Sequence, residues 1–187
     1  MKKSKWFPLA LVLPFLLSAC GYNTIQTMDE SAAAAKQQIE VQLQRRADLV
    51  PNLVETVKGY AKQEEKIFVA VAEARAGLAG AVQGGNVAQM ANANEAMTGA
   101  LGRLLAISEN YPQLKSDANF LRLQDELAGT ENRIAVSRTD YNNAVRDYNA
   151  YIRRFPAVLT AKVTGAKSRE YFEVTNAAAK DAPQVKF

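Results

Sequence analysis

The 187-residue chain contains no histidine and one cysteine. Without histidine it has no imidazole base for Ser-His or Cys-His nucleophilic catalysis, and no imidazole ligand for a metal. A single cysteine excludes an internal disulfide and a cluster of thiolate ligands. We therefore predict a protein that is not an enzyme and that has no metal site and no cofactor.

The chain also has little net charge once its first residues are set aside. Its 23 basic and 19 acidic side chains give a net charge of +4, but Lys2, Lys3 and Lys5 lie at the N-terminus. Without that segment 20 basic side chains face 19 acidic ones, a net charge of about +1. A nucleic-acid-binding protein needs a basic face, so we expect no nucleic-acid partner.

The N-terminal segment lacks the length of a membrane span. From Trp6 to Ala19 there are 14 residues, interrupted by Pro8 and Pro14, whereas a span needs roughly 20. A basic start, a short apolar run and a small-residue ending are typical of a secretory signal. We therefore predict a signal peptide over residues 1–19.

The lone cysteine stands at the end of this signal. Leu17-Ser18-Ala19-Cys20 resembles the bacterial lipobox, in which the cysteine thiol takes a diacylglyceryl group and the chain is cut just before it. We predict lipid attachment at Cys20, a lipidated linker over 20–29, and a membrane partner through that lipid. By resemblance to Gram-negative lipoproteins, Gly21 rather than Asp favours the outer membrane over the inner one, with the protein facing the periplasm.

Strand signals are scarce in the rest of the chain, and apolar residues recur at spacings of three and four, which is typical of helices. Asp29 or Ser31 can cap a first helix with a kink at Pro51, and Gly77, Gly80, Gly84 and Gly85 end it. Two rows spaced by seven predict its buried side, as in a supercoiled bundle: Leu43, Val50, Val57, Val71 and Leu78, and Ile39, Leu53, Tyr60, Ile67 and Ala74.

Three further helices are expected. Asn86 can cap the second, which Pro112 ends, and Ser116 or Asp117 can start the third. The third carries a row without a polar member: Phe120, Leu127, Ile134, Tyr141, Tyr148 and Phe155. A shorter fourth helix is expected over 157–176, with core candidates Val158, Leu159, Val163 and Phe172. The prediction is an all-α, antiparallel four-helix bundle over 30–176, followed by an extended tail over 177–187.

Several motifs together resemble the LemA family over almost the whole of the chain after Cys20. They include the run 45–54 around Pro51, Glu73-Ala74-Arg75, Thr130-Glu131-Asn132-Arg133-Ile134, Tyr141-Asn142, Tyr148-Asn149, Phe155-Pro156 and the final residues 182–187. The resemblance implies a helical bundle tethered to a membrane by its N-terminus, and no known enzyme activity. Where relatives often have histidine, this chain has Gln63.

Polar residues interrupt the apolar rows. Arg46 and Glu64 belong to the first helix, and Glu131 and Arg138 lie beside the row of the third. A buried charge is costly without a partner, so we predict a structural ion pair between helices. In this prediction Glu64 pairs with Arg138, and Glu131 lies near them. Asn142 and Asn149 follow tyrosines; they are solvated or bonded to tyrosine, or else they form a stripe that binds a peptide or glycan.

The predicted helix lengths leave part of the first helix uncovered. The second helix would fold back only to about Val50, so residues 29–48 would stand as a stalk. Because this stalk carries Ile39, Val41 and Leu43, we predict a partner surface there, for an unidentified envelope protein or for self-association. The alternative is that a distorted bundle or the C-terminal tail covers it.

The sequence favours a non-enzymatic, membrane-tethered periplasmic lipoprotein that acts as a helical scaffold or protein-interaction module at the cell envelope. The alternatives are a glycan-active enzyme that uses paired carboxylates, or a small-ligand carrier whose cavity is lined by Met90, Met97 and tyrosines. A pocket of a few hundred Å³ would favour either alternative.

Overall fold

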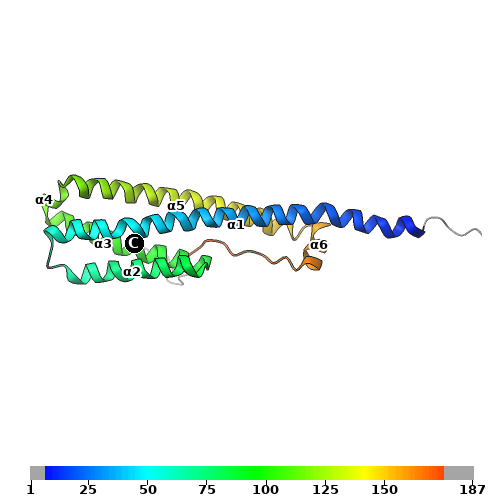
Figure 1. Ribbon diagram of the computed structural model, residues 1–187, viewed down its shortest axis with the longest axis horizontal. Helices are drawn as coiled ribbons and strands as arrows, with labels where there is room; N and C mark the ends of the chain where they lie inside the picture. Colours follow the sequence, from blue (N-terminus) through cyan, green and yellow to red (C-terminus); the bar gives the residue numbers. More distant parts are fainter. Residues whose placement is uncertain (1–6, 175–187) are drawn as a thin grey trace, which may run out of the picture. The chain divides into compact units, whose positions relative to one another are not determined.

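The computed structural model describes residues 7–174, with side chains described from Gly21 onward (Figure 1). Within that range the chain is helical and contains no strand, so the all-α prediction is confirmed. The elements are α1 (Phe7–Tyr60), α2 (Glu65–Gly84), α3 (Val87–Ile107), the 3-10 helix η1 (Ser108–Asn110), α4 (Pro112–Lys115), α5 (Ala118–Tyr151) and α6 (Ala157–Thr164). The chain thus forms six α-helices in this range, not four. The tail predicted over 177–187 and the side chains of the predicted signal and Cys20 lie outside the described residues.

The chain divides into two compact units. Unit 1 comprises residues 1–37 and 139–170, and unit 2 comprises residues 38–138 and 171–187. The two longest helices, α1 and α5, each contribute residues to both units.

In unit 2 the chain turns where an unbroken helix was predicted. α1 ends at Tyr60, after Gly59, and α2 begins at Glu65. The turn is closed by the amide of Ala61 bonding Val57 O at 2.9 Å and the amide of Glu64 bonding Ala61 O at 3.3 Å. The prediction of one unbroken helix is therefore wrong, although α2 does end at Gly84, within the glycine run that was predicted to end it. The turn was not predicted from the sequence because the seven-residue spacing of buried residues continues through it, from Val57 to Val71.

Side-chain contacts give the directions of the helices in unit 2. Tyr60 at the end of α1 donates to Asp117 at the start of α5, at 3.0 Å, and Arg133 on α5 donates to Gln42 on α1, at 3.2 Å. These two contacts require α5 to run antiparallel to α1. α2 and α3 lie side by side as a hairpin (Figure 1), which turns at Gly85, whose φ of 65° is left-handed.

Two predicted helix caps are confirmed in unit 2. The Asn86 side chain accepts the amide of Gln89 at 2.9 Å at the start of α3. The Asp117 carboxylate accepts the amide of Phe120 at 2.9 Å at the start of α5. Each satisfies one of the backbone donors that a helix start leaves unpaired.

The predicted core rows are largely buried. All members of the first row, from Leu43 to Leu78, are buried, and so are the members of the α5 row from Phe120 to Tyr148. Tyr60 is partly exposed, and Phe155 is 82% exposed. The prediction for Phe155 was wrong because α5 ends at Tyr151, four residues before it.

In unit 1 the residues predicted as a linker are helical. Residues 21–29 belong to α1, and Ile25 is buried with Tyr148, Ile152 and Ala161 in an apolar cluster. Ser31, considered as a helix cap, instead bonds Thr27 O at 2.8 Å inside α1. The helix starts earlier than predicted because the apolar pattern already includes Ile25.

The fourth helix is shorter than predicted. α6 ends at Thr164 because Gly165 adopts a left-handed φ of 73°, and residues 166–174 have no helix. Among its expected core residues Phe172 is buried, Val158 is half-buried, and Leu159 and Val163 are exposed. The helix therefore buries its alanines, Ala157 and Ala161, in place of its larger side chains.

Candidate functional site

A buried arginine connects three helices of unit 2. Arg46 on α1 is buried, donates to Asn94 on α3 at 2.7 Å, and forms an ion pair with Glu131 on α5. Burial lowers the pKa of Arg46, while the Glu131 charge raises it in part; a guanidinium remains charged under these conditions. The site is an interhelical ion pair of the kind predicted, and it fixes the register of α1 against α3 and α5.

The structure does not bring the predicted partners Glu64 and Arg138 together. Glu64 lies in the turn before α2, close in sequence to Tyr60, which contacts the start of α5. Arg138 lies 21 residues further along from Asp117, roughly 32 Å at the rise of an α-helix. The predicted register assumed that α1 continued through Glu64, and the turn at 61–64 removes that assumption. Of the residues predicted for the ion pair, Glu131 has Arg46 as its described partner.

The predicted partner surface on α1 is largely buried. Ile39 and Leu43 have no exposed area, and Val41 alone among the three is exposed, at 57%. They are covered because α5 runs alongside this part of α1, as the bond between Arg133 and Gln42 shows. Ile39 and Leu43 therefore lie within the helical fold and not on an uncovered stalk.

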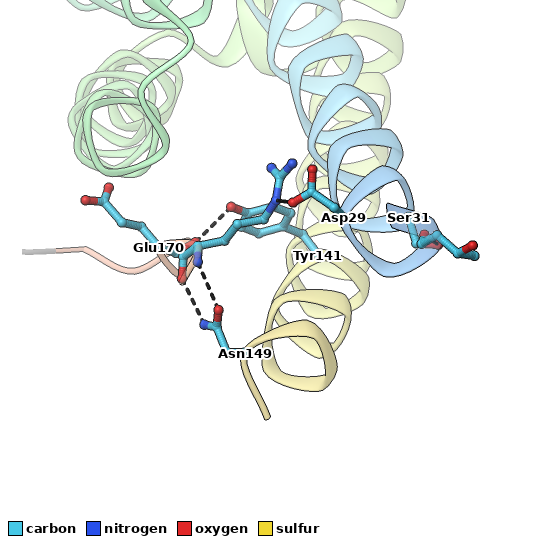
Figure 2. Close-up of polar contacts among 7 residues, drawn as sticks. Asp29, Ser31, Tyr141, Asn149 and Glu170 are labelled. Carbon is cyan, nitrogen blue, oxygen red and sulfur yellow. Dashed lines mark hydrogen bonds and ion pairs between the residues drawn. The ribbon is translucent and has the colours of Figure 1, made fainter. Parts of the chain in front are cut away.

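In unit 1 an extended segment is clamped onto two helices (Figure 2). The Asn149 side chain on α5 makes two hydrogen bonds to the backbone of Arg169, donating to its carbonyl at 2.9 Å and accepting its amide at 2.9 Å. Tyr141, two turns away on α5, donates to Glu170 O at 2.8 Å. We call the residues Tyr141, Asn149, Arg169 and Asp29 the clamp.

The fourth member ties the clamp to α1. Arg169 Nε lies 2.7 Å from the Asp29 carboxylate. That hydrogen bond lowers the pKa of Asp29 and raises the pKa of Arg169. Burial, followed by the charge of Asp29, raises the pKa of Tyr148 nearby. The clamp therefore holds a charged pair and a peptide backbone together at one end of α5.

The clamp shows what the side chain of Asn149 binds. Asn149 does bind a peptide backbone, but the peptide is a segment of the same chain. Arg169 was not among the predicted site residues. The two Tyr-Asn pairs on one helix could have indicated this contact, because the side-chain amide of an asparagine can bond both the N–H and the C=O of an extended residue.

A groove runs between α1 and α2 in unit 2. Its wider part is an open depression of about 550 Å³, and a narrower part of about 210 Å³ extends to Arg75. Both parts share Lys58, Phe68 and Ala72, and the Lys58 ammonium lies 5.7 Å from the centre of the Phe68 ring, a cation–π distance. We call it the α1/α2 groove. The predicted lining residues Met90 and Met97 are instead fully buried in α3.

The helix that forms one side of this groove is unusually apolar. α2 is long and apolar enough to cross a membrane by length and composition: it contains an 18-residue window with a mean hydropathy of 1.2, of which 17% is buried. Its Arg75 donates to Ala47 O on α1 at 2.9 Å, and it packs against α3. These contacts are those of a surface helix of unit 2. Among the described residues, no three histidine, cysteine or acidic side chains are grouped so as to hold a metal.

Comparison with known proteins identifies the family. The LemA family model matches residues 35–187. The magnetosome proteins MamQ 1 and MamQ 2 of Paramagnetospirillum magneticum and MamQ of Magnetospirillum gryphiswaldense are each 32% identical, over 81% of this chain. The chain spans 64% of the length of these relatives. The family match covers well over half of the chain, and the chain therefore belongs to the LemA family.

Proposed function

We propose that this protein is a lipid-anchored, non-enzymatic helical scaffold of the bacterial cell envelope, facing the periplasm. The observation that carries the proposal is the packing of α1 directly after Cys20, where Ile25 is already part of an apolar core with α5 and α6. A lipid on Cys20 would then be joined to a folded unit without a flexible linker. Such an anchor holds the protein in a defined position at a membrane surface.

The composition and the family support the same function. The chain has no histidine to act as a general base, and the resemblance to LemA proteins implies a helical bundle tethered at its N-terminus. The helices of unit 2, with α5 antiparallel to α1 and α2 paired with α3, fit an antiparallel four-helix bundle. Buried rows and the ion pair of Arg46 with Glu131 make that bundle rigid, as a scaffold requires.

The α1/α2 groove is the partner site in this proposal. It offers an apolar floor at Phe68 and Ala72 and an exposed Val69, and it is also lined by Lys62, by Glu65 and by Lys58, which pairs with Glu55. A partner helix with an apolar edge would fit such a surface. This site replaces the one predicted around Ile39 and Leu43.

The anchor is tested with fatty-acid labelling. Cys20→Ser should abolish incorporation of a labelled fatty acid and release the protein from the membrane fraction. Gly21→Asp should shift the protein toward the inner membrane in a density gradient, while Gly21→Ser, of similar bulk, should not. Labelling that persists in Cys20→Ser would refute the anchor.

The partner site is tested by photocrosslinking in cells. A crosslinker at Val69 should give an intermolecular adduct, and Ala72→Arg, which fills the groove, should remove it without loss of helicity. A crosslinker at Val136, an exposed position on α5, is the matched control. An adduct at Val69 that survives Ala72→Arg, or equal adducts at Val69 and Val136, would place the partner elsewhere.

The depression of about 550 Å³ also favours a second function, the carriage of a small ligand. It lies within the size range of ligand pockets. Native mass spectrometry of the purified protein should then show a retained molecule that Ala72→Arg releases. A mass equal to that of the lipidated chain alone would contradict this second function.

A further inference from the structure

Unit 1 exposes a row of large apolar side chains. Phe155 is 82% exposed, Leu159 56% and Val163 88%. The spacing of four places Leu159 and Val163 on one side of α6, with Phe155 just before the helix begins. We call these three residues the docking row. Single exposed apolar residues are common, but two on one side of an eight-residue helix, with a third just before its start, indicate a surface that something else covers.

The other side of α6 is already occupied. Ala157 and Ala161 are buried against the rest of unit 1, and Ala161 belongs to the cluster around Ile25. α6 is therefore apolar on two sides, one packed within the protein and one open.

The surroundings of the docking row are basic. Residues 148–169 contain five lysines and arginines and no acidic residue. Four of them are exposed: Arg153, Arg154, Lys162 and Lys167. The fifth, Arg169, is paired with Asp29. Lysine and arginine beside an apolar row match the headgroups of an anionic bilayer, because the cations meet phosphates while the apolar side chains enter the acyl boundary.

α6 also lies beside the start of the mature chain. A methyl group at Gly21 would lie 3.3 Å from Thr160 Oγ1 and 3.8 Å from the Cα of Ala157, so the glycine lets α6 approach α1 closely. Gly21 directly follows Cys20 in the sequence. A lipid on Cys20 would therefore enter the membrane next to α6.

We propose that the docking row and its four exposed basic residues form a second membrane contact, seated in the headgroup layer of the bilayer that holds the Cys20 lipid. The inference rests on the lipid attachment proposed above. The diacylglyceryl group proposed on Cys20 brings two acyl chains, which already hold the protein at the membrane. The contact sets the orientation of unit 1 on the membrane, which a lipid alone does not do.

The experiment uses the full lipidated chain in vesicles of phosphatidylethanolamine and phosphatidylglycerol. The lipidated chain begins at Cys20 and so lacks Trp6, the only tryptophan of the sequence, and Leu159→Trp therefore introduces a single fluorophore. Its emission should shift to the blue and be quenched by brominated lipid. Val136→Trp, at an exposed position of unit 2, should show neither effect. Arg153→Gln with Arg154→Gln should weaken the quenching, and more so at high salt.

The outcomes separate this inference from the lipid anchor. A protein that floats with the vesicles but shows no quenching at position 159 refutes the docking row alone. A protein that does not float refutes the anchor and the docking row together. The row could instead contact a second copy of the chain. In that case diluting the protein would return the tryptophan emission to that of a solvent-exposed residue, and Leu159→Cys would form disulfide dimers. These two results together would refute membrane docking.

Discussion

Arg75 and Pro51 are coupled through one carbonyl group. In a regular α-helix the carbonyl of Ala47 would accept the amide of residue 51, but that residue is proline and has no amide hydrogen. α1 continues through Pro51 all the same, and Ala47 is buried. The freed carbonyl accepts a hydrogen bond from Arg75 Nε on α2, at 2.9 Å. The proline thus creates an acceptor on α1 that joins α1 to α2.

The coupling predicts that the cost of Arg75→Ala in free energy of unfolding depends on the residue at position 51. Arg75→Ala leaves a buried acceptor without a donor, which costs about 1–3 kcal/mol; we expect about 1–2 kcal/mol because the Arg75 side chain is itself exposed. Pro51→Ala supplies the missing amide within α1. In that background the same Arg75→Ala change should cost about 1 kcal/mol less, since the carbonyl already has a partner.

The assay is a double-mutant cycle by urea denaturation, followed by far-UV circular dichroism, on the chain without its signal and with Cys20→Ser. Arg103→Ala, an exposed arginine on α3, is the control and should be near neutral with or without Pro51. Additivity of Pro51→Ala and Arg75→Ala within about 0.3–0.5 kcal/mol, the limit for independent sites, would refute the coupling.

Three further predictions concern the polar sites. Asn149→Ala removes both backbone bonds to Arg169 and should make trypsin cut faster after Lys167 and Arg169; an unchanged cleavage rate would show that the clamp does not hold the segment. Arg46→Ala should destabilise the fold by about 2 kcal/mol, below the roughly 3–5 kcal/mol for a fully buried pair because Glu131 is half-exposed, whereas Arg46→Met with Glu131→Gln should be nearly neutral. The pKa of Asp29 is lowered from its ordinary value of 3.8, so its contribution to stability is complete above that value and is lost as pH falls through the lower pKa of the folded state. The difference in urea midpoint between the wild type and Asp29→Asn should therefore be constant at neutral pH and vanish in acid; a constant difference at all pH values would contradict this.

Periodicity and capping chemistry were enough to predict helices, most of the buried residues and two helix starts. The α5 row shows why: from Phe120 to Tyr148 each seventh residue is apolar and buried, because the burial of one helix face leaves a direct trace in the sequence. Asn86 and Asp117 were recognisable because their side chains bond the backbone three residues on, a purely local contact.

The turn at 61–64 could not be found in this way, and its omission explains the errors in the candidate site. A tight hairpin that preserves the seven-residue spacing leaves the apolar pattern intact, so Val57 and Val71 fit a continuous helix as well as two helices. Under the assumption of one continuous helix, Glu64 was expected beside Arg138, and Ile39 was expected to be uncovered. In the actual register Arg46 meets Glu131, and α5 covers Ile39. Leu159 and Val163 show a different limit, because an apolar pattern predicts burial without saying whether the chain itself provides it.

The clamp and the docking row are parts of one device in unit 1. α6 is held at its start by the end of α5 and at its end by the extended segment that Asn149 and Tyr141 fix to α5. The docking row can meet a membrane as a rigid surface only while both attachments persist. Asn149→Ala should therefore weaken the lipid quenching of the tryptophan introduced by Leu159→Trp, although it changes no residue of the row and no exposed charge. Asn52→Ala, at an exposed asparagine of unit 2, should leave the quenching unchanged. If Asn149→Ala accelerates tryptic cleavage yet quenching stays at its full value, α6 docks independently of the clamp, and the two features serve separate purposes.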